Sequence, residues 1–129
     1  MTTVQQVFDI AITLMDEQSE TTGKTQNSDN QEYRFRTLPI LAALLPQLGA
    51  AATPVLPQNP ADPDFSQPVL LEDCLCLGVL PYGLASHLLA GENERLAAWF
   101  QERFREGVAL LKDADAAEFK PIGTPYGLF

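Results

Sequence analysis

The chain is poor in basic residues, histidine and cysteine. Its 129 residues include eight Lys and Arg against 17 Asp and Glu, for a formal net charge of −9 at pH 7, with one His and two Cys. Because phosphate contacts need clustered Lys and Arg side chains, this balance argues against a dedicated DNA- or RNA-binding protein. Two Cys are also too few for a disulfide framework.

Long hydrophobic runs are missing as well. No apolar stretch approaches the ~20 residues that a membrane-spanning helix needs. Residues 1–18 have no basic segment and contain Asp9 midway, so they lack the pattern of a signal peptide. We therefore expect a cytoplasmic protein without a membrane partner. Hydrophobic residues make up 46% of the chain, which is enough for the core of one domain.

The spacing of apolar residues predicts an all-α fold. In the first segment they recur at three- and four-residue intervals, which predicts a helix at 3–18. Thr3 and Gln6 have the spacing of a capping box at its start. The same periodicity predicts further helices at 30–48, 72–90 and 93–112, and therefore a bundle of four main helices.

Prolines complicate two of these helices. Pro39 either kinks a single helix at 30–48 or starts a new one, and the uninterrupted apolar period favours the single kinked helix. Pro81 should kink the helix at 72–90 near Leu77. A strand through 74–80 is a less favoured alternative, because it has no obvious partner. Apolar residues cover every face of the 72–90 helix, so it should be the most buried of the four.

The remaining segments lack helical periodicity. Residues 19–29 are polar and predict a loop. Residues 50–71 contain five of the chain's ten prolines and predict an extended excursion around the domain. We expect residues 1–112 to form a single helical domain and residues 113–129 to form an extended C-terminal tail. The apolar side chains of that tail dock either on their own domain or on a neighbouring subunit, and we favour the neighbour.

No residue pattern indicates catalysis, a metal or a cofactor. Residues 22–25 resemble the end of a phosphate-binding loop, but Gln18 stands where that loop needs a glycine. One residue separates Cys74 from Cys76, whereas two residues separate the cysteines of redox and zinc pairs. Buried structural thiols are therefore the favoured interpretation. His87 has no neighbour in sequence with which it could form a catalytic pair. We predict a protein that is not an enzyme.

Several side chains are candidates for an interface. The spacing of Trp99 with Phe100 and Phe104 favours a core stripe, and an aromatic recognition patch is the alternative. His87 fits a packing or interface role better than a metal site. The candidate interface residues are Tyr82, His87, Trp99, Phe119, Tyr126, Leu128 and Phe129.

Three stretches carry a resemblance to a known class of proteins: YRFRTLPILAALLPQL, VLPYGLASHLLAGEN and AAWFQERFREGVALL. Together they resemble small acidic proteins encoded beside capsid and portal genes in prophages of Gram-positive bacteria. The four-helix plan is similar to that of the head–tail connector proteins of long-tailed phages, which assemble as a ring beneath the portal.

The resemblance implies a non-enzymatic structural protein of a phage or prophage. Its expected partners are portal, neck or tail proteins and other copies of itself in a ring, with no sequence-specific nucleic acid. It would lie in the cytoplasm during assembly and in the virion afterwards. The alternative is a bacterial helical adaptor or regulatory module that binds a partner protein.

Overall fold

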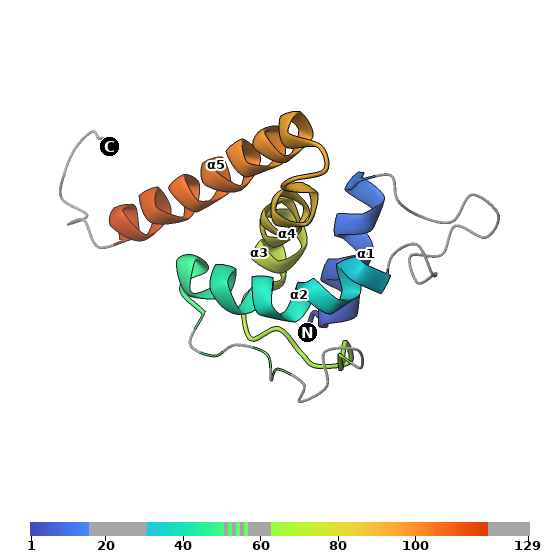
Figure 1. The fold of residues 1–129 in the computed structure, drawn as a ribbon. Helices are drawn as coiled ribbons and strands as arrows, with labels where there is room; N and C mark the ends of the chain where they lie inside the picture. The colour runs from blue at the N-terminus through green and yellow to red at the C-terminus, as the bar shows by residue number, and fades with distance from the viewer. Residues whose placement is uncertain (16–30, 51, 53, 55, 57–62, 119–129) are drawn as a thin grey trace.

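A computed structural model describes residues 1–15, 31–50, 52, 54, 56 and 63–118, with the backbone alone for 113–118 (Figure 1). The fold is all-α, as predicted. The helices are α1 (Val4–Met15), α2 (Gln31–Leu44) continued by the 3-10 turn η2 (Leu45–Leu48), α3 (Asp73–Gly78), α4 (Leu80–Leu89) and α5 (Glu94–Glu118). The predicted loop at 19–29 and the predicted last turn of the first helix, 16–18, lie outside the described residues.

The predicted capping box at the start of α1 is confirmed. The backbone N–H of Thr3 donates to Gln6 Oε1 at 2.8 Å, and the backbone N–H of Gln6 donates to Thr3 Oγ1 at 3.3 Å. These reciprocal bonds satisfy donors that an α-helix leaves free in its first turn. The start of α1 is therefore specified by residues close together in the sequence.

The end of the proline-rich excursion packs against the same turn of α1. The backbone N–H groups of Val4 and Gln5 donate to the carbonyls of Gln67 and Phe65 at 3.0 and 2.9 Å. The Phe65 ring lies 5.1 Å from the Phe8 ring, with the Arg34 guanidinium 4.2 Å above Phe65. This part of the excursion is thus fixed to the domain by backbone bonds and by ring packing.

The chain passes Pro39 as a single helix, as predicted, and α2 ends only at Leu44. Pro39 is exposed on the outer side of the helix. Pro46 then falls in the first turn of η2, where a missing N–H costs no intrahelical bond. Gly49 ends this element with a φ of +83°, a left-handed conformation that glycine adopts without steric cost.

The predicted single helix at 72–90 is wrong, because the structure has two helices there. They are separated at Val79, whose φ of −122° and ψ of −51° end α3 and begin α4. Pro81 lies in the first turn of α4, where a backbone N–H would have no partner within the helix. Its missing N–H therefore costs no hydrogen bond, and Pro81 begins a helix and does not kink one. The burial prediction holds for α4 alone, because Cys76 is the only fully buried residue of α3.

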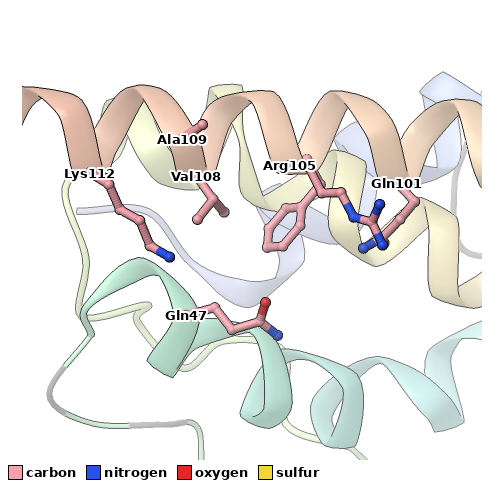
Figure 2. Close-up of a pocket in the computed structure, with 7 residues that line it drawn as sticks. Gln47, Gln101, Arg105, Val108, Ala109 and Lys112 are labelled. Atoms are coloured by element: carbon pink, nitrogen blue, oxygen red, sulfur yellow. The ribbon is translucent and has the colours of Figure 1, made fainter.

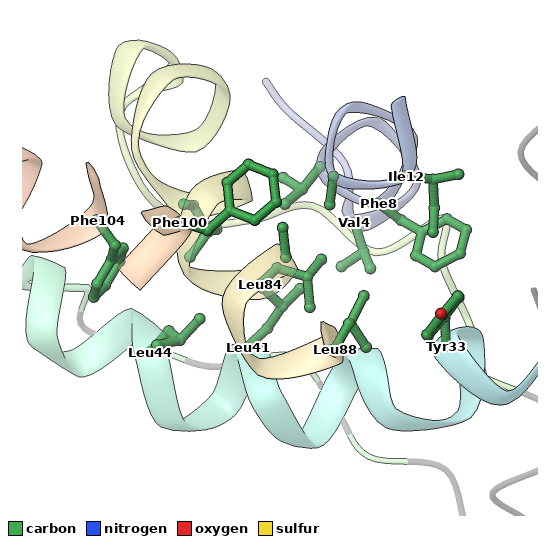
Figure 3. Packing of buried hydrophobic residues seen from close by; sticks show 14 of the residues in the cluster. Val4, Phe8, Ile12, Tyr33, Leu41, Leu44, Leu84, Leu88, Phe100 and Phe104 are labelled. Carbon is green, nitrogen blue, oxygen red and sulfur yellow. The ribbon is translucent and has the colours of Figure 1, made fainter. Parts of the chain in front are cut away.

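The core is built around α4, which lies between α1 and α5 and above α2 (Figures 1 and 3). Gly83 allows this close approach, since a Cβ there would lie 2.7 Å from the Phe104 ring and 3.0 Å from Leu44. The largest fully buried side chains come from α1, α2, η2, α4 and α5. They are Val4, Phe8, Ile12, Leu38, Leu41, Leu44, Leu45, Leu80, Leu84, Leu88, Phe100 and Phe104.

The last helix begins where predicted and ends later than predicted. The backbone N–H of Leu96 donates to Asn93 Oδ1 at 3.1 Å, so Asn93 caps the helix. The helix continues to Glu118, so the expected extended tail at 113–129 is wrong for 113–118. Three of these six residues are alanine, the best helix former, and the first helix-breaking residue is Pro121. Residues 119–129 lie outside the described part of the chain.

Candidate interaction surface

Three aromatic rings meet where α4 and α5 pack together. The centroid of the Trp99 ring lies 5.1 Å from that of Phe100 and 6.5 Å from that of Tyr82, and both pairs are edge to face. The centroids of the Tyr82 and Phe100 rings are 6.1 Å apart. Aromatic pairs in such geometries stabilise by about 0.5–1.5 kcal/mol beyond the area they bury. Phe100 is buried in the core, whereas Trp99 remains 49% exposed. The cluster therefore fixes a large apolar side chain at the surface.

A cation also contacts the exposed ring. The Arg103 Cζ atom lies 5.1 Å from the centroid of the Trp99 ring, one helical turn along α5. Its Nη1 atom forms an ion pair with Glu106 Oε1 at 3.1 Å. The cation–π contact and the ion pair hold the guanidinium beside the indole. The surface thus combines Trp, Tyr and Arg side chains.

A shallow hollow adjoins the indole. It has a volume of about 460 Å³, its surface is mostly apolar, and it is lined by Asn93, Arg95, Leu96 and Trp99. Leu96 lies three residues before Trp99, so both side chains project from the same side of α5. We refer to Tyr82, Leu96, Trp99 and Arg103 as the Trp99 surface.

The prediction that Trp99 belongs to the core stripe is wrong. Phe100 and Phe104 fill the core, while Leu96, Val108 and Leu111 are partly buried. These positions span a wide arc of α5, and the helix is covered mainly by α4, which lies on the Phe100 side. Trp99 is at the edge of that arc, so half of its side chain faces solvent. Periodicity identifies the apolar face of a helix but not how much of that face a neighbour covers.

Of the other predicted interface residues, the structure describes only His87, and His87 does not join this surface. His87 is exposed in the last turn of α4, so it has no packing role. It follows Tyr82 by five residues, which places it about 140° around the helix. Phe119, Tyr126, Leu128 and Phe129 lie outside the described residues.

The two cysteines lie on different sides of α3. Cys76 is buried and its Sγ lies 3.5 Å from the Leu71 carbonyl oxygen. Burial raises the pKa of this thiol, with a smaller contribution from the Asp73 carboxylate, so the reactive thiolate is disfavoured. Cys74 is exposed, which corrects the prediction that both thiols are buried. Neither cysteine belongs to the Trp99 surface.

Thiol alkylation should distinguish the two cysteines. When the native protein is treated with iodoacetamide near neutral pH, we expect Cys74 to be modified and Cys76 to remain free, because Cys76 is inaccessible and its pKa is raised. Mass spectrometry of the digested protein measures both sites. In urea both should react. Equal modification of the two thiols in the native protein would contradict the packing of α3.

A lowered pKa occurs at the start of α3. Thr2 donates to Asp73 Oδ1 through its hydroxyl at 2.8 Å and through its backbone N–H at 3.1 Å. The hydroxyl bond is the main reason that the pKa of the Asp73 carboxyl is lowered. Thr2 and Asp73 lie 71 residues apart in the sequence, so these bonds join the N-terminus to the start of α3 and have a structural role. Within the described ranges, no three His, Cys, Asp or Glu side chains are grouped closely enough to hold a metal ion.

A second hollow lies between η2 and α5 (Figure 2). It has a volume of about 420 Å³ and is lined by Gln47, Gln101, Phe104, Arg105, Val108, Ala109 and Lys112. An adjoining hollow of about 520 Å³ shares Gln47 and Lys112 with it and is also lined by Pro46, Leu48, Gly49, Leu71, Glu72, Leu75 and Leu111. We refer to the two together as the η2–α5 groove. Nothing in the sequence indicates it, because it depends on how η2 lies against a helix more than fifty residues later.

Comparison with protein-family models, with curated proteins and with solved structures finds no match for this chain. Among the described residues, no helix is both long enough and apolar enough to cross a membrane.

Proposed function

We propose that the protein is a non-enzymatic assembly subunit that binds a partner protein through the Trp99 surface. The observation that carries this proposal is the half-exposed Trp99 ring, held between Tyr82, Phe100 and Arg103. Trp, Tyr and Arg are the residues that most often dominate the binding energy of protein interfaces. A tryptophan whose position is already fixed also loses little conformational entropy when a partner covers it.

The hollow beside Trp99 adds shape to this surface. Its apolar lining suits an aliphatic or aromatic side chain of the partner, while Asn93 and Arg95 provide polar groups at its edge. Interfaces of this type have an apolar centre and a polar rim. The net charge of −9 would accelerate association with a partner that carries a basic surface.

The more specific form of the proposal is a structural protein of a phage or prophage, at the head–tail junction. It is supported by the resemblance of three stretches, of which the second contains Tyr82 and the third contains Trp99 and Arg103. The residues that carry the resemblance thus include most of the Trp99 surface. Portal, neck or tail proteins and further copies in a ring are the proposed partners. The protein would reach the virion from the cytoplasm.

A binding measurement with these partners tests the proposal. We expect isothermal titration with purified portal, neck or tail protein from the same genome to show binding that Trp99→Ala weakens by at least ~30-fold, the effect of losing a hot spot of about 2 kcal/mol. Phe35→Ala on α2 is the matched control, because Phe35 is also aromatic and exposed, at 36%. It should bind as the wild type does.

Two results would contradict the proposal. Binding that Trp99→Ala leaves unchanged would place the interface elsewhere. Absence of binding to every head–tail protein would remove the phage role, and a Trp99-dependent complex with a cellular protein would then favour the adaptor alternative.

A further inference from the structure

The η2–α5 groove is separate from the Trp99 surface and has a different chemistry. We propose that residues 119–129 of the same chain dock in this groove as an extended segment. The groove is formed partly by α5, the helix that leads directly into these residues. The inference is independent of the proposed phage role.

The floor of the groove is apolar. Its rim carries the donors of Gln47, Gln101, Arg105 and Lys112 and one acceptor-only carboxylate, Glu72. Phe104 is buried beneath it, and Val108 and Leu111 are only partly covered. Figure 2 shows Gln47 on the η2 side opposite the α5 side chains that include Arg105 and Lys112. Arginine and lysine side chains carry donors and no acceptors, and each glutamine amide carries two donors.

The sequence of residues 119–129 complements these properties. Five of its eleven side chains are large and apolar, namely Phe119, Ile122, Tyr126, Leu128 and Phe129. Pro121 and Pro125 lack a backbone N–H but keep their carbonyls, so the segment offers more acceptors than donors and cannot continue α5. A donor-rich rim over an apolar floor suits an extended segment of this composition.

The distances also fit. The distance along α5 from Glu118 back to Gln101 is about 26 Å, because the helix rises 1.5 Å per residue. Eleven extended residues reach at most about 36 Å, so the segment could reverse and run along the whole groove. Attachment to the same helix gives the segment a high effective concentration at the groove, which a neighbouring molecule must exceed. The structure therefore favours docking on the same chain, although the sequence alone favours a neighbour.

Paramagnetic relaxation tests the proposal on the full chain. A nitroxide label is attached to Thr124→Cys in a Cys74→Ser background, since the remaining Cys76 is buried. In ¹⁵N-labelled protein diluted with unlabelled, label-free protein, we expect the amides of Gln47, Val108 and Ala109 to lose most of their signal intensity. The amide of Ile12, on α1, should keep its intensity.

A mixed sample distinguishes the same chain from a neighbour. When the nitroxide is on unlabelled molecules and ¹⁵N on nitroxide-free molecules, the proposal predicts no loss of intensity. Loss in the mixed sample alone would show docking on a neighbour, and no loss in either sample would leave the groove without this segment. Either result would overturn the proposal.

A pair of variants tests whether the groove itself is required. Val108→Glu places a charge on the groove floor and should restore the lost signal intensity in the spin-labelled chain. Leu110→Glu is the matched control, because Leu110 lies two residues away on α5 and is 69% exposed. It should leave the intensity loss unchanged. Equal behaviour of the two variants would show that the segment does not contact the groove floor.

Discussion

Leu88→Asp is expected to destabilise the protein by roughly 4 kcal/mol or more, enough to unfold it under many conditions, because it buries an unpaired carboxylate. Leu88 is completely buried on α4, where Figure 3 shows it in the core with Leu41 and Tyr33. Urea denaturation followed by circular dichroism measures the loss. If the substituted protein remains folded, its unfolding midpoint should fall far below that of the wild type.

The neighbouring residue provides a matched control. His87→Asp introduces the same side chain one position earlier in the same helical turn, but His87 is exposed. Both substitutions place a negative charge near the C-terminus of α4, which itself costs about 0.3–1 kcal/mol. We expect His87→Asp to cost no more than this. Equal effects of the two substitutions would contradict the central position of α4.

Phe100→Ala is expected to have the second-largest effect, a loss of about 3–5 kcal/mol, because a fully buried aromatic side chain is removed and a cavity remains. Phe100 contacts both Tyr82 and Trp99 and is only 2% exposed. Thermal and urea denaturation measure the change. The m-value is the slope of the unfolding free energy against urea concentration. If the variant has the same m-value as the wild type, the substitution has changed stability alone.

Trp99→Ala is the control for this prediction. Half of the indole is already exposed, so its removal should cost about 2 kcal/mol, roughly half of the loss for a fully buried ring. This cost includes the two edge-to-face contacts. This difference between adjacent residues is also what makes Trp99→Ala suitable for the binding measurement, since the variant should remain folded. A cost for Trp99→Ala equal to that for Phe100→Ala would show that Trp99 is a core residue.

The elements that the sequence predicts well are those specified by local interactions. The Thr3–Gln6 capping box, which the sequence predicts, involves residues three positions apart. The Asn93 cap and the stop at Gly49 are equally local. Helix capping depends on local side-chain and backbone chemistry, so it is visible in a single sequence. The overall fold class follows from the same local periodicity.

The division between α3 and α4 combines a local feature, Pro81 in the first turn of α4, with a contact that is distant in the sequence. Val79, where the chain leaves α3, packs on Gly107 of α5, and a Cβ at Gly107 would lie 2.7 Å from Val79 Cγ1. No residue near Val79 indicates that a small residue will face it. The same limitation explains Trp99, whose exposure depends on which part of α5 is covered by α4. The sequence underestimates the length of α5 for a different reason. Residues 113–118 have no apolar periodicity, and the Gly and Pro residues that follow from Pro121 onward favour an extended tail.

Hydrogen–deuterium exchange on the protein alone and in complex with the partner protein proposed above tests most directly whether the Trp99 surface is the interface. We predict slower exchange in the complex at residues 93–103 and around Tyr82, with no change in α1. Slower exchange confined to α1 and residues 65–69, with none at 93–103, would contradict the account.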